Sequence, residues 1–431
     1  MANKQISSRA TGPGNIKSIA IVSNTNSKKT FDLVSLGAPV VFKYYESLLQ
    51  DVIYATVTYV DGGTLPGGTA VADLPITGSE TVKIVFEDVN EEELEVDLLI
   101  NKVSEVYEDS GKSMVTLEMN SKELFDNDKI RLNTRLDGKI SDHIETILTD
   151  AEYLETGKEL HIEETQGTYN KIMNNKKPFY MMNYLSTLAV PSSNPEAPKN
   201  SAGYLLWETS EGFHFRSVDW LFNKEKNPKK RSILYSDTSD SDGLNIPPGY
   251  DMKALAFEKD NRNDIKKKLE QGAYSTRLIT FNPFNCFYEV TYPNADNKPS
   301  EEGRPAGNEG GQKNLTLAGE ELPVLNPTIK SAKGGTNDFS RTTFKYLDVG
   351  TLPEGEGVGE KQQEDAGQVA KSKDENANPA KILNQAIQRL NQMNNFKISI
   401  TLPGDFTLHA GDTVFVDSPL LDAGKKTEQQ T

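Results

Sequence analysis

Near its C-terminus the chain contains the segment Phe396-Lys-Ile-Ser-Ile-Thr-Leu-Pro-Gly-Asp-Phe-Thr-Leu-His-Ala-Gly-Asp-Thr-Val-Phe-Val416. Apolar and polar residues alternate along it, and Gly-Asp steps at residues 404–405 and 411–412 punctuate the alternation. A period of two is typical of a strand that buries one face, and Gly and Asp are typical of turns. The segment predicts two closing strands of a β-barrel with a structural role, not a catalytic pocket.

A helix should deliver the chain into these strands. Residues 380–394 are amphipathic, with one apolar face made of Ile382, Leu383, Ala386, Ile387, Leu390 and Met393. Upstream, the sequence predicts a helix within 252–271 and a strand over 274–292 that bends at Asn282-Pro283. Between them, residues 293–379 are rich in Gly, Pro, Glu and Lys, with one candidate strand at 339–349. We therefore expect a second, discontinuous β-barrel from residues 251–292 and 380–420, interrupted by a loop-rich insertion at 293–379.

The N-terminal part of the chain predicts a first barrel. Eight runs rich in apolar, aromatic or β-branched residues are separated by turn residues: 16–22, 31–36, 40–49, 52–60, 81–86, 93–99, 102–107 and 113–119. They predict an antiparallel barrel or sandwich over residues 15–122.

Residues 123–250 change period. Apolar spacing over 139–148 and a Pro-initiated segment at 178–189 predict two helices that flank a short strand at 159–163. Strands at 204–208 and 210–215 then predict a hairpin turning at Glu211-Gly212. This region should be a small α/β domain.

Composition limits the function. The chain has 431 residues and a formal net charge of -16, which disfavours specific binding of nucleic acid through its phosphates. Residues 1–14 lack the apolar core of a signal peptide, and no stretch approaches the roughly 20 apolar residues of a membrane helix. We expect no membrane-spanning segment and assembly in solution.

The chemical motifs are weak. The single cysteine, Cys286, lies in an aromatic run and is expected to be a buried structural thiol. Ser110-Gly-Lys-Ser113 lacks the first glycine of a phosphate-binding loop, because that position is Val106. The acidic run at 237–243 does not fit a calcium loop. The histidines, at positions 143, 161, 214 and 409, lie far apart in sequence, and no local pattern singles out a carboxylate pair. The sequence therefore predicts no catalytic, cofactor-binding or metal site.

Three charged runs have ordinary explanations. The densest acidic run, residues 87–97, is expected to be a solvated turn between strands; the alternative is an acidic lumen or partner-facing rim. Basic runs at 224–231 and 266–268 are expected on solvated faces, or in contact with acidic neighbours of an assembly.

Several segments together resemble the baseplate hub proteins of contractile-tailed bacteriophages, the T-even type in particular. They are Asp137-Gly-Lys-Ile-Ser-Asp-His-Ile144, Thr165-Gln-Gly-Thr-Tyr-Asn170, residues 178–188, Tyr204-Leu-Leu-Trp207, residues 212–221, Leu269-Glu-Gln-Gly-Ala-Tyr-Ser-Thr-Arg277 and Phe281-Asn-Pro-Phe284. The likeness covers most of the chain apart from the insertion, but its motifs are packing and turn signatures.

The resemblance implies a mainly β fold with α+β parts: two related antiparallel β-barrels, of which the first is tube-like, plus the small α/β domain and the loop-rich insertion. It implies a homotrimer whose six barrels form a ring, joining a hexameric tail tube to a trimeric central spike and leaving a channel for DNA.

The resemblance also implies partners and a location. The partners are the tail tube or a tube-initiator protein, the central spike protein, baseplate wedge proteins, a tape measure protein and genomic DNA in transit. The location is the virion's tail baseplate, assembled in the host cytoplasm. Three chains at -16 each carry 3 × -16 = -48, and an acidic channel wall would let DNA pass without capture.

Two alternatives stay open. The chain can belong to the spike or hub of a phage-like secretion system or tailocin particle. A tail-associated cell-wall hydrolase is a different class, and would need a carboxylate pair in a cleft.

Overall fold

The protein is described by a computed structural model that covers residues 14–24, 29–35, 40–61, 76–88, 92–107, 113–169, 171–192, 202–235, 246, 249–282, 287–292, 316–322, 339–346 and 379–418. The fold is mainly β with α+β parts, as the sequence predicted. Cys286 and the acidic run at 237–243 lie outside these residues. Of the Ser110–Ser113 motif, only Ser113 is described.

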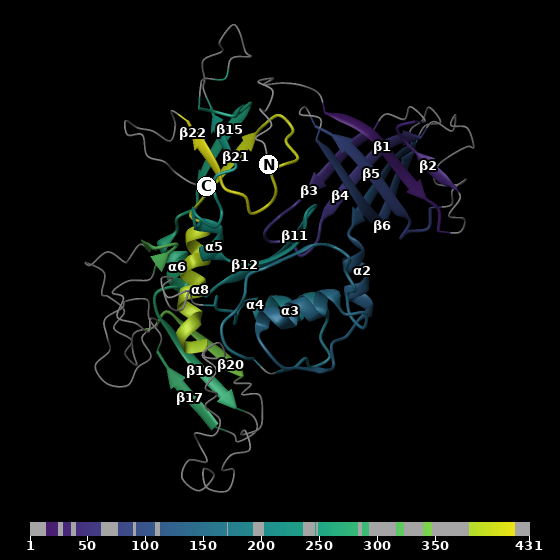
Figure 1. The fold of residues 1–431 in the computed structure, drawn as a ribbon. Coiled ribbons are helices and arrows are strands. Elements are labelled where there is room, and N and C mark those ends of the chain that lie inside the picture. The colour runs from purple at the N-terminus through teal and green to yellow at the C-terminus, as the bar shows by residue number, and fades with distance from the viewer. Residues whose placement is uncertain are drawn as a thin grey trace.

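The N-terminal region forms one curled, seven-stranded antiparallel sheet (Figure 1). Its strands are β1 (Asn15–Val22), β2 (Thr30–Asp32), β3 (Val40–Tyr45), β4 (Tyr54–Asp61), β5 (Thr81–Glu87), β6 (Glu93–Tyr107) and β7 (Ser113–Asn120). They follow the order β2-β1-β5-β6-β7-β4-β3. Alternate side chains point into a core that includes Ile19, Val57, Ile84, Leu98 and Leu117. The period-two pattern thus produces one buried and one solvated face.

The sheet differs from the expected barrel in two ways. Residues 93–99 and 102–107, expected as two strands, are one strand, β6, with a register shift between Ile100 and Lys102. A bulge of this kind bends and twists a strand without ending it, which helps the sheet to curl. Among the described strands the sheet is also open: β2 and β3 are its edges, so its shape is a half-barrel.

The middle of the chain is a compact α/β unit below the half-barrel in Figure 1. It contains α2 (Lys122–Lys129), β8 (Arg135–Leu136), α3 (Ile140–Thr149), β9 (Leu160–Ile162), β10 (Lys171–Ile172), α4 (Pro178–Ser186), β11 (Tyr204–Thr209), β12 (Gly212–Ser217) and α5 (Val218–Phe222). The two predicted helices, the short strand and the hairpin are confirmed. Helices α3 and α4 pack their apolar faces against β11 and β12 in one buried cluster.

The C-terminal β region is built from two small sheets. Strand β13 (Arg231–Leu234) pairs in parallel with β14 (Met252–Lys253) and β22 (Val414–Asp417). Strand β15 (Ala256–Asn261) pairs antiparallel with β21 (Phe396–Thr401). The sheets share a core around Ile233, Met252 and Val416, to which Phe257 and Ile400 add. The second β region is therefore mixed, and its two closing strands belong to different sheets.

The helix expected within 252–271 is confirmed as α6 (Ile265–Glu270), and most of 252–261 before it is strand. One expectation for this part was wrong. The segment over 274–292 does not bend as one strand: β16 (Thr276–Asn282) and β17 (Phe287–Thr291) form an antiparallel hairpin. The residue after Asn282 is a proline, which has no N–H to donate to a sheet ladder, so the sequence favours ending β16 at Asn282.

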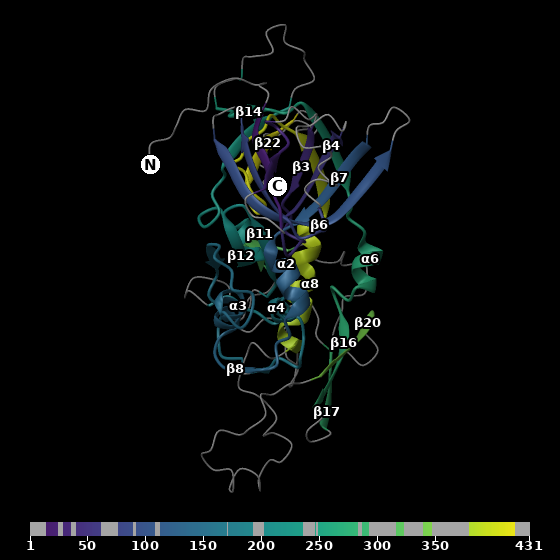
Figure 2. The same cartoon turned by 90° about the vertical axis from the view of Figure 1, so that its right-hand side faces the viewer.

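Strand β20 (Arg341–Tyr346) pairs in parallel with β16 and completes a three-stranded sheet at the end of the molecule far from the C-terminal β region. The short strands β18 (Thr316–Leu317) and β19 (Glu320–Glu321) form a hairpin. Helix α8 (Pro379–Met393) runs between the two ends (Figures 1 and 2). Its Arg389 forms an ion pair of 2.9 Å with Asp219 of α5.

Strand pairing crosses the expected boundary at residue 250, because β13 pairs with β14 and β22. The four-part division of the chain stays a prediction. In the described ranges no helix has the length and apolarity needed to cross a membrane.

Candidate functional site

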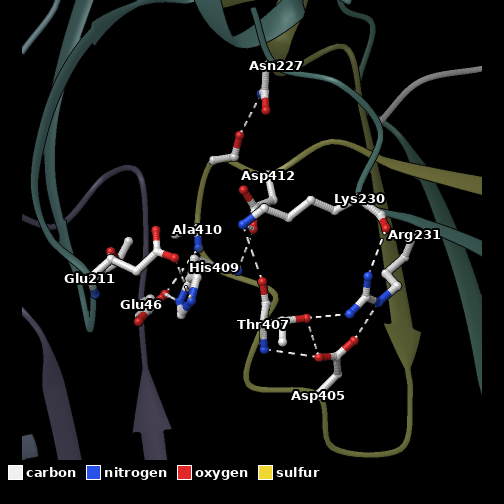
Figure 3. A network of polar contacts seen from close by, with 12 residues as sticks. Glu46, Glu211, Asn227, Lys230, Arg231, Asp405, Thr407, His409, Ala410 and Asp412 are labelled. Carbon is white, nitrogen blue, oxygen red and sulfur yellow. Dashed lines mark hydrogen bonds and ion pairs between the residues drawn. The ribbon is translucent and has the colours of Figure 1, made fainter. Parts of the chain in front are cut away.

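The C-terminal loop, residues 402–413 between β21 and β22, lies where the half-barrel, the α/β unit and the C-terminal β region meet (Figure 3). Both Gly-Asp steps of the sequence lie in this loop, not in strands. The carboxylate of Asp405 accepts hydrogen bonds from the backbone N–H and the hydroxyl of Thr407, and that of Asp412 accepts from the backbone N–H of His409 at 2.8 Å. The two aspartates therefore fold the loop on itself.

The start of β13 anchors the loop from outside. Lys230 Nζ lies 2.7 Å from Asp412 Oδ2, and Arg231 Nε lies 2.8 Å from Asp405 Oδ2 (Figure 3). Burial would raise the pKa of Asp405, but hydrogen bonds from Thr407 and Arg231 outweigh it and lower that pKa. In the basic run 224–231, these two side chains thus contact carboxylates of their own chain.

Three aromatic rings stack across neighbouring strands beside the loop. Trp207 of β11 pairs in register with His214 of β12, which pairs in register with His161 of β9. The centroids of Trp207 and His214 are 5.1 Å apart, and those of His214 and His161 are 4.5 Å apart. Residues opposite one another share a face of the sheet, so the register brings together two histidines that are 53 positions apart in the sequence.

Two glycines permit this arrangement. Gly212 begins β12 with φ +140°, and a Cβ there would stand 2.1 Å from the carbonyl oxygen of Glu159, so only glycine lets β12 approach β9. Gly411 has φ +100°, and a Cβ there would stand 2.9 Å from the Trp207 ring. The indole N–H of Trp207 donates to the carbonyl of Ala410 at 2.9 Å, so the loop covers the ring closely.

His409 of the C-terminal loop forms ion pairs with two glutamates near the stack. His409 Nδ1 lies 3.4 Å from a carboxylate oxygen of Glu46, and its Nε2 lies 3.5 Å from Glu211 (Figure 3). Glu46 also accepts the backbone N–H groups of Ser210 at 2.8 Å and Ala410 at 3.1 Å. It therefore joins the half-barrel to both the hairpin and the loop.

The pKa shifts of His409 and Glu46 favour the charged form of both side chains. Burial lowers the pKa of His409, but the hydrogen bond and charge of Glu46, with Glu211, outweigh burial and raise it. Burial raises the pKa of Glu46, but His409 and the two backbone donors outweigh it and lower it. Burial beside the other histidines lowers the pKa of His214 to about 3, so this imidazole is neutral at physiological pH.

A second polar network joins the half-barrel to the α/β unit from below. Glu208 of β11 is buried and accepts from the backbone N–H of Ile53 at 3.0 Å and the hydroxyl of Ser121 at 2.9 Å. Lys158 bridges Glu208 and the buried Glu123 of α2. The two carboxylates share this one lysine: burial raises the pKa of Glu208 despite Lys158, whereas Lys158 and Thr156 outweigh burial and lower the pKa of Glu123.

The four histidines considered in the sequence do not all lie at this site. Of the four histidines, three converge here, and His143 lies apart on α3, where its Nε2 is 2.6 Å from the carbonyl oxygen of Tyr169. One ring nitrogen each from His161 and His214 and a carboxylate oxygen of Glu211 lie within 4.8 Å of one another. Sequence spacing alone missed this cluster. The signal present was the repeated pattern apolar-His-apolar in Leu160-His-Ile and Phe213-His-Phe, two short strands able to pair.

No protein-family model matches the chain, and no curated protein matches it in sequence. Among solved structures it is similar to a tail protein from Neisseria meningitidis MC58, with 9% identity and a TM-score of 0.47 over 96% of this chain and 89% of that one. The 43 kDa tail protein of prophage MuSo2 from Shewanella oneidensis has 10% identity and a TM-score of 0.43, covering 96% and 91%. A prophage tail protein from Listeria monocytogenes EGD-e has 8% identity and a TM-score of 0.40, covering 96% and 88%. Because every score is below 0.5, these likenesses do not assign a function to the chain.

Proposed function

We propose that the chain is a structural adaptor of a phage-type tail, the baseplate hub of a contractile tail. It assembles as a homotrimer that presents six β units in a ring between a hexameric tube and a trimeric spike. Wedge proteins and a tape measure protein are further partners. Its place is the tail baseplate of the virion, assembled in the host cytoplasm, and its role is mechanical, not enzymatic.

The observation that carries this proposal is the open half-barrel. Among the described strands, β2 and β3 have only one hydrogen-bonded neighbour in the sheet. Along β3 the side chain of Val41 is 58% exposed and that of Tyr45 is 44% exposed, and Leu49 just beyond is 71% exposed. An open strand edge with apolar side chains is a site for pairing with another chain, and closure into a ring would satisfy it.

A second observation supports an adaptor rather than a flexible pair of modules. The C-terminal loop contacts the half-barrel through Glu46 and through Asp88, whose carboxylate accepts the backbone N–H of Phe406 at 3.2 Å. The same loop binds β13 of the C-terminal β region through Asp405 and Asp412. A protomer that supplies two units to one ring needs this kind of fixed connection, because loosely joined units would not keep ring geometry.

The charge supports passage of DNA without capture. The outward residues Glu93, Glu95 and Asp97 alternate with buried apolar ones along β6, so this acidic row lies on the solvated face of the sheet. Glu93 pairs with Lys17, and Asp97 lies 3.9 Å from Lys83. If this face lines the channel, its carboxylates repel phosphate.

The test is the mass of the purified chain by light scattering, at several concentrations and salt levels. We expect a trimer near three times 47.7 kDa. Val41→Lys places a charge beside the open edge of β3 and should shift the mass toward the monomer. The matched control is Met114→Lys, since Met114 is 41% exposed but lies on β7, a central strand of the same sheet.

A persistent monomer at every concentration, or equal masses for both variants, would count against edge-mediated assembly. Release of fragments from purified cell wall would instead favour the hydrolase alternative, and it is measured on the same preparation.

A further inference from the structure

The histidine cluster beside the C-terminal loop has a composition that the adaptor role does not require. Two imidazoles and one carboxylate come from β9, β12 and the hairpin turn, and their ligand atoms lie within 4.8 Å of one another. Imidazole nitrogen with carboxylate oxygen is a donor set typical of zinc and neighbouring divalent transition metals, whereas magnesium and calcium prefer oxygen alone.

One ring nitrogen of a histidine in this cluster has no hydrogen-bond partner among the described residues. The Nε2 atom of His161 is buried and makes no hydrogen bond within the described residues. A buried polar atom without a partner costs free energy, so such atoms in a native fold call for an explanation. A bound cation would satisfy this nitrogen.

The second histidine has the support that metal ligands commonly have. One ring nitrogen of His214, Nε2, lies 2.9 Å from the hydroxyl of Thr209. That hydroxyl also accepts the backbone N–H of Glu211 at 3.2 Å, so the hairpin turn holds it in place. An oxygen on one ring nitrogen fixes the tautomer and orientation of a ligating histidine. His214 stacks between Trp207 and His161, with 22° between the two imidazole planes, so His161 must turn about its Cβ–Cγ bond for both rings to direct a nitrogen at one cation.

The third member of the cluster, Glu211, reaches solvent and has room to move. The side chain of Glu211 is 50% exposed, so a cation can enter from solvent and the carboxylate can move toward it. Tetrahedral zinc with ligands at about 2.1 Å keeps neighbouring ligand atoms about 3.4 Å apart, so atoms that now lie within 4.8 Å of one another must approach by up to about 1.4 Å as the ring turns.

We propose that His161, His214 and Glu211 form a binding site for a divalent transition-metal cation of the zinc class. Bound there, the cation joins β9, β12 and the β11–β12 turn, the surface on which the C-terminal loop rests. The site is distinct from the strand edge proposed for assembly, so either proposal can fail without the other.

The experiment uses full-length protein without a histidine tag, freed of metal by a chelator and then titrated with Zn²⁺ by calorimetry. We expect one zinc per chain. Loading with Co²⁺ gives an independent readout, because cobalt bound by nitrogen and oxygen absorbs visible light according to its geometry. Mg²⁺ serves as the hard-cation comparison and should not compete.

Three variants assign the ligands. His214→Ala and His161→Gln should abolish binding, and Glu211→Gln should weaken the zinc affinity by about 10- to 100-fold or more, at least the loss seen for the outer partners of metal ligands. Glu225→Gln is the matched control, because Glu225 is an exposed carboxylate on the loop after α5. His143→Gln controls for removing any one histidine.

No zinc binding to the wild-type chain, or binding that is unchanged in Glu211→Gln and His161→Gln, overturns the proposal. Circular dichroism verifies the fold of each variant. If His214→Ala does not fold, Glu211→Gln still decides the outcome, because its half-exposed side chain can lose its charge without opening the core.

Discussion

At the scale of single residues, the contact between Gly411 and Trp207 fixes the C-terminal loop against the α/β unit. We expect Gly411→Ala to destabilise the protein by roughly 2 kcal/mol or more, because the methyl group strains a backbone at positive φ and overpacks against a buried ring. The urea midpoint measures the loss. Tryptophan fluorescence should also change in the folded state, because the indole must move.

The control is the other glycine that precedes an aspartate in the same loop. A Cβ at Gly404 would meet no atom within 4 Å. Gly404→Ala should therefore change stability by no more than about 0.5 kcal/mol. Equal losses in the two variants would mean that the Trp207 contact does not carry the effect.

At this scale the sequence predicted strands over β1, β5 and β6, whose side chains alternate between more and less buried positions, as the period of a strand requires. It did not predict which distant side chains meet. His161 and His214 could not be paired in advance, because their meeting depends on a parallel register between β9 and β12. Register between distant strands is not encoded in either strand alone.

At the scale of elements, the C-terminal loop is held against β13 by the ion pair between Asp405 and Arg231, and the strength of this contact depends on pH. The folded-state pKa of Asp405 is lowered, so its contribution to stability is present at neutral pH. The contribution is lost as the pH falls below the ordinary Asp value of about 3.9 and through the folded pKa.

We expect Asp405→Asn to be less stable than the wild type at pH 7, and the difference to shrink toward pH 3. Urea midpoints across that range measure it. Asp137→Asn is the control, because Asp137 pairs with Arg135 on the surface, where the two side chains are 59% and 44% exposed. A difference that stays constant down to pH 3 would contradict the role of the Asp405 charge.

Element prediction was best where a segment had a strong period and clear ends. Helix α3 and helix α8 were predicted within a residue or two of their bounds. Residues 252–271 contain a helix, as expected, but it is limited to α6, because Ala256–Asn261 pairs with β21, a contact that no local propensity reports. Likewise, β16 and β17 turn back on one another where a single bent strand was expected.

At the scale of the whole molecule, Phe406 of the C-terminal loop joins the half-barrel to the other parts of the chain. Its ring meets Phe86 of β5 edge-on, with 5.0 Å between the ring centroids, and its backbone N–H donates to the carboxylate of Asp88. The sequence predicted a barrel in each half of the chain but not this contact, since it joins residues 320 positions apart. An adaptor that transmits force between two β units depends on such coupling.

We expect Phe406→Ala to loosen the half-barrel selectively. Removing a partly buried aromatic ring costs roughly 2–3 kcal/mol, below the range for a fully buried one, so amide exchange in β1, β5 and β6 should accelerate by about 30- to 150-fold. Exchange in α3 and α4 should stay unchanged, because their core lies in the α/β unit. Phe396→Ala is the matched control, since Phe396 lies on β21 and contacts Lys259 rather than the half-barrel. Uniform acceleration through the molecule would contradict this prediction, because it would mean that the chain unfolds as one cooperative unit and that the Phe406 contact does not stabilise the half-barrel selectively.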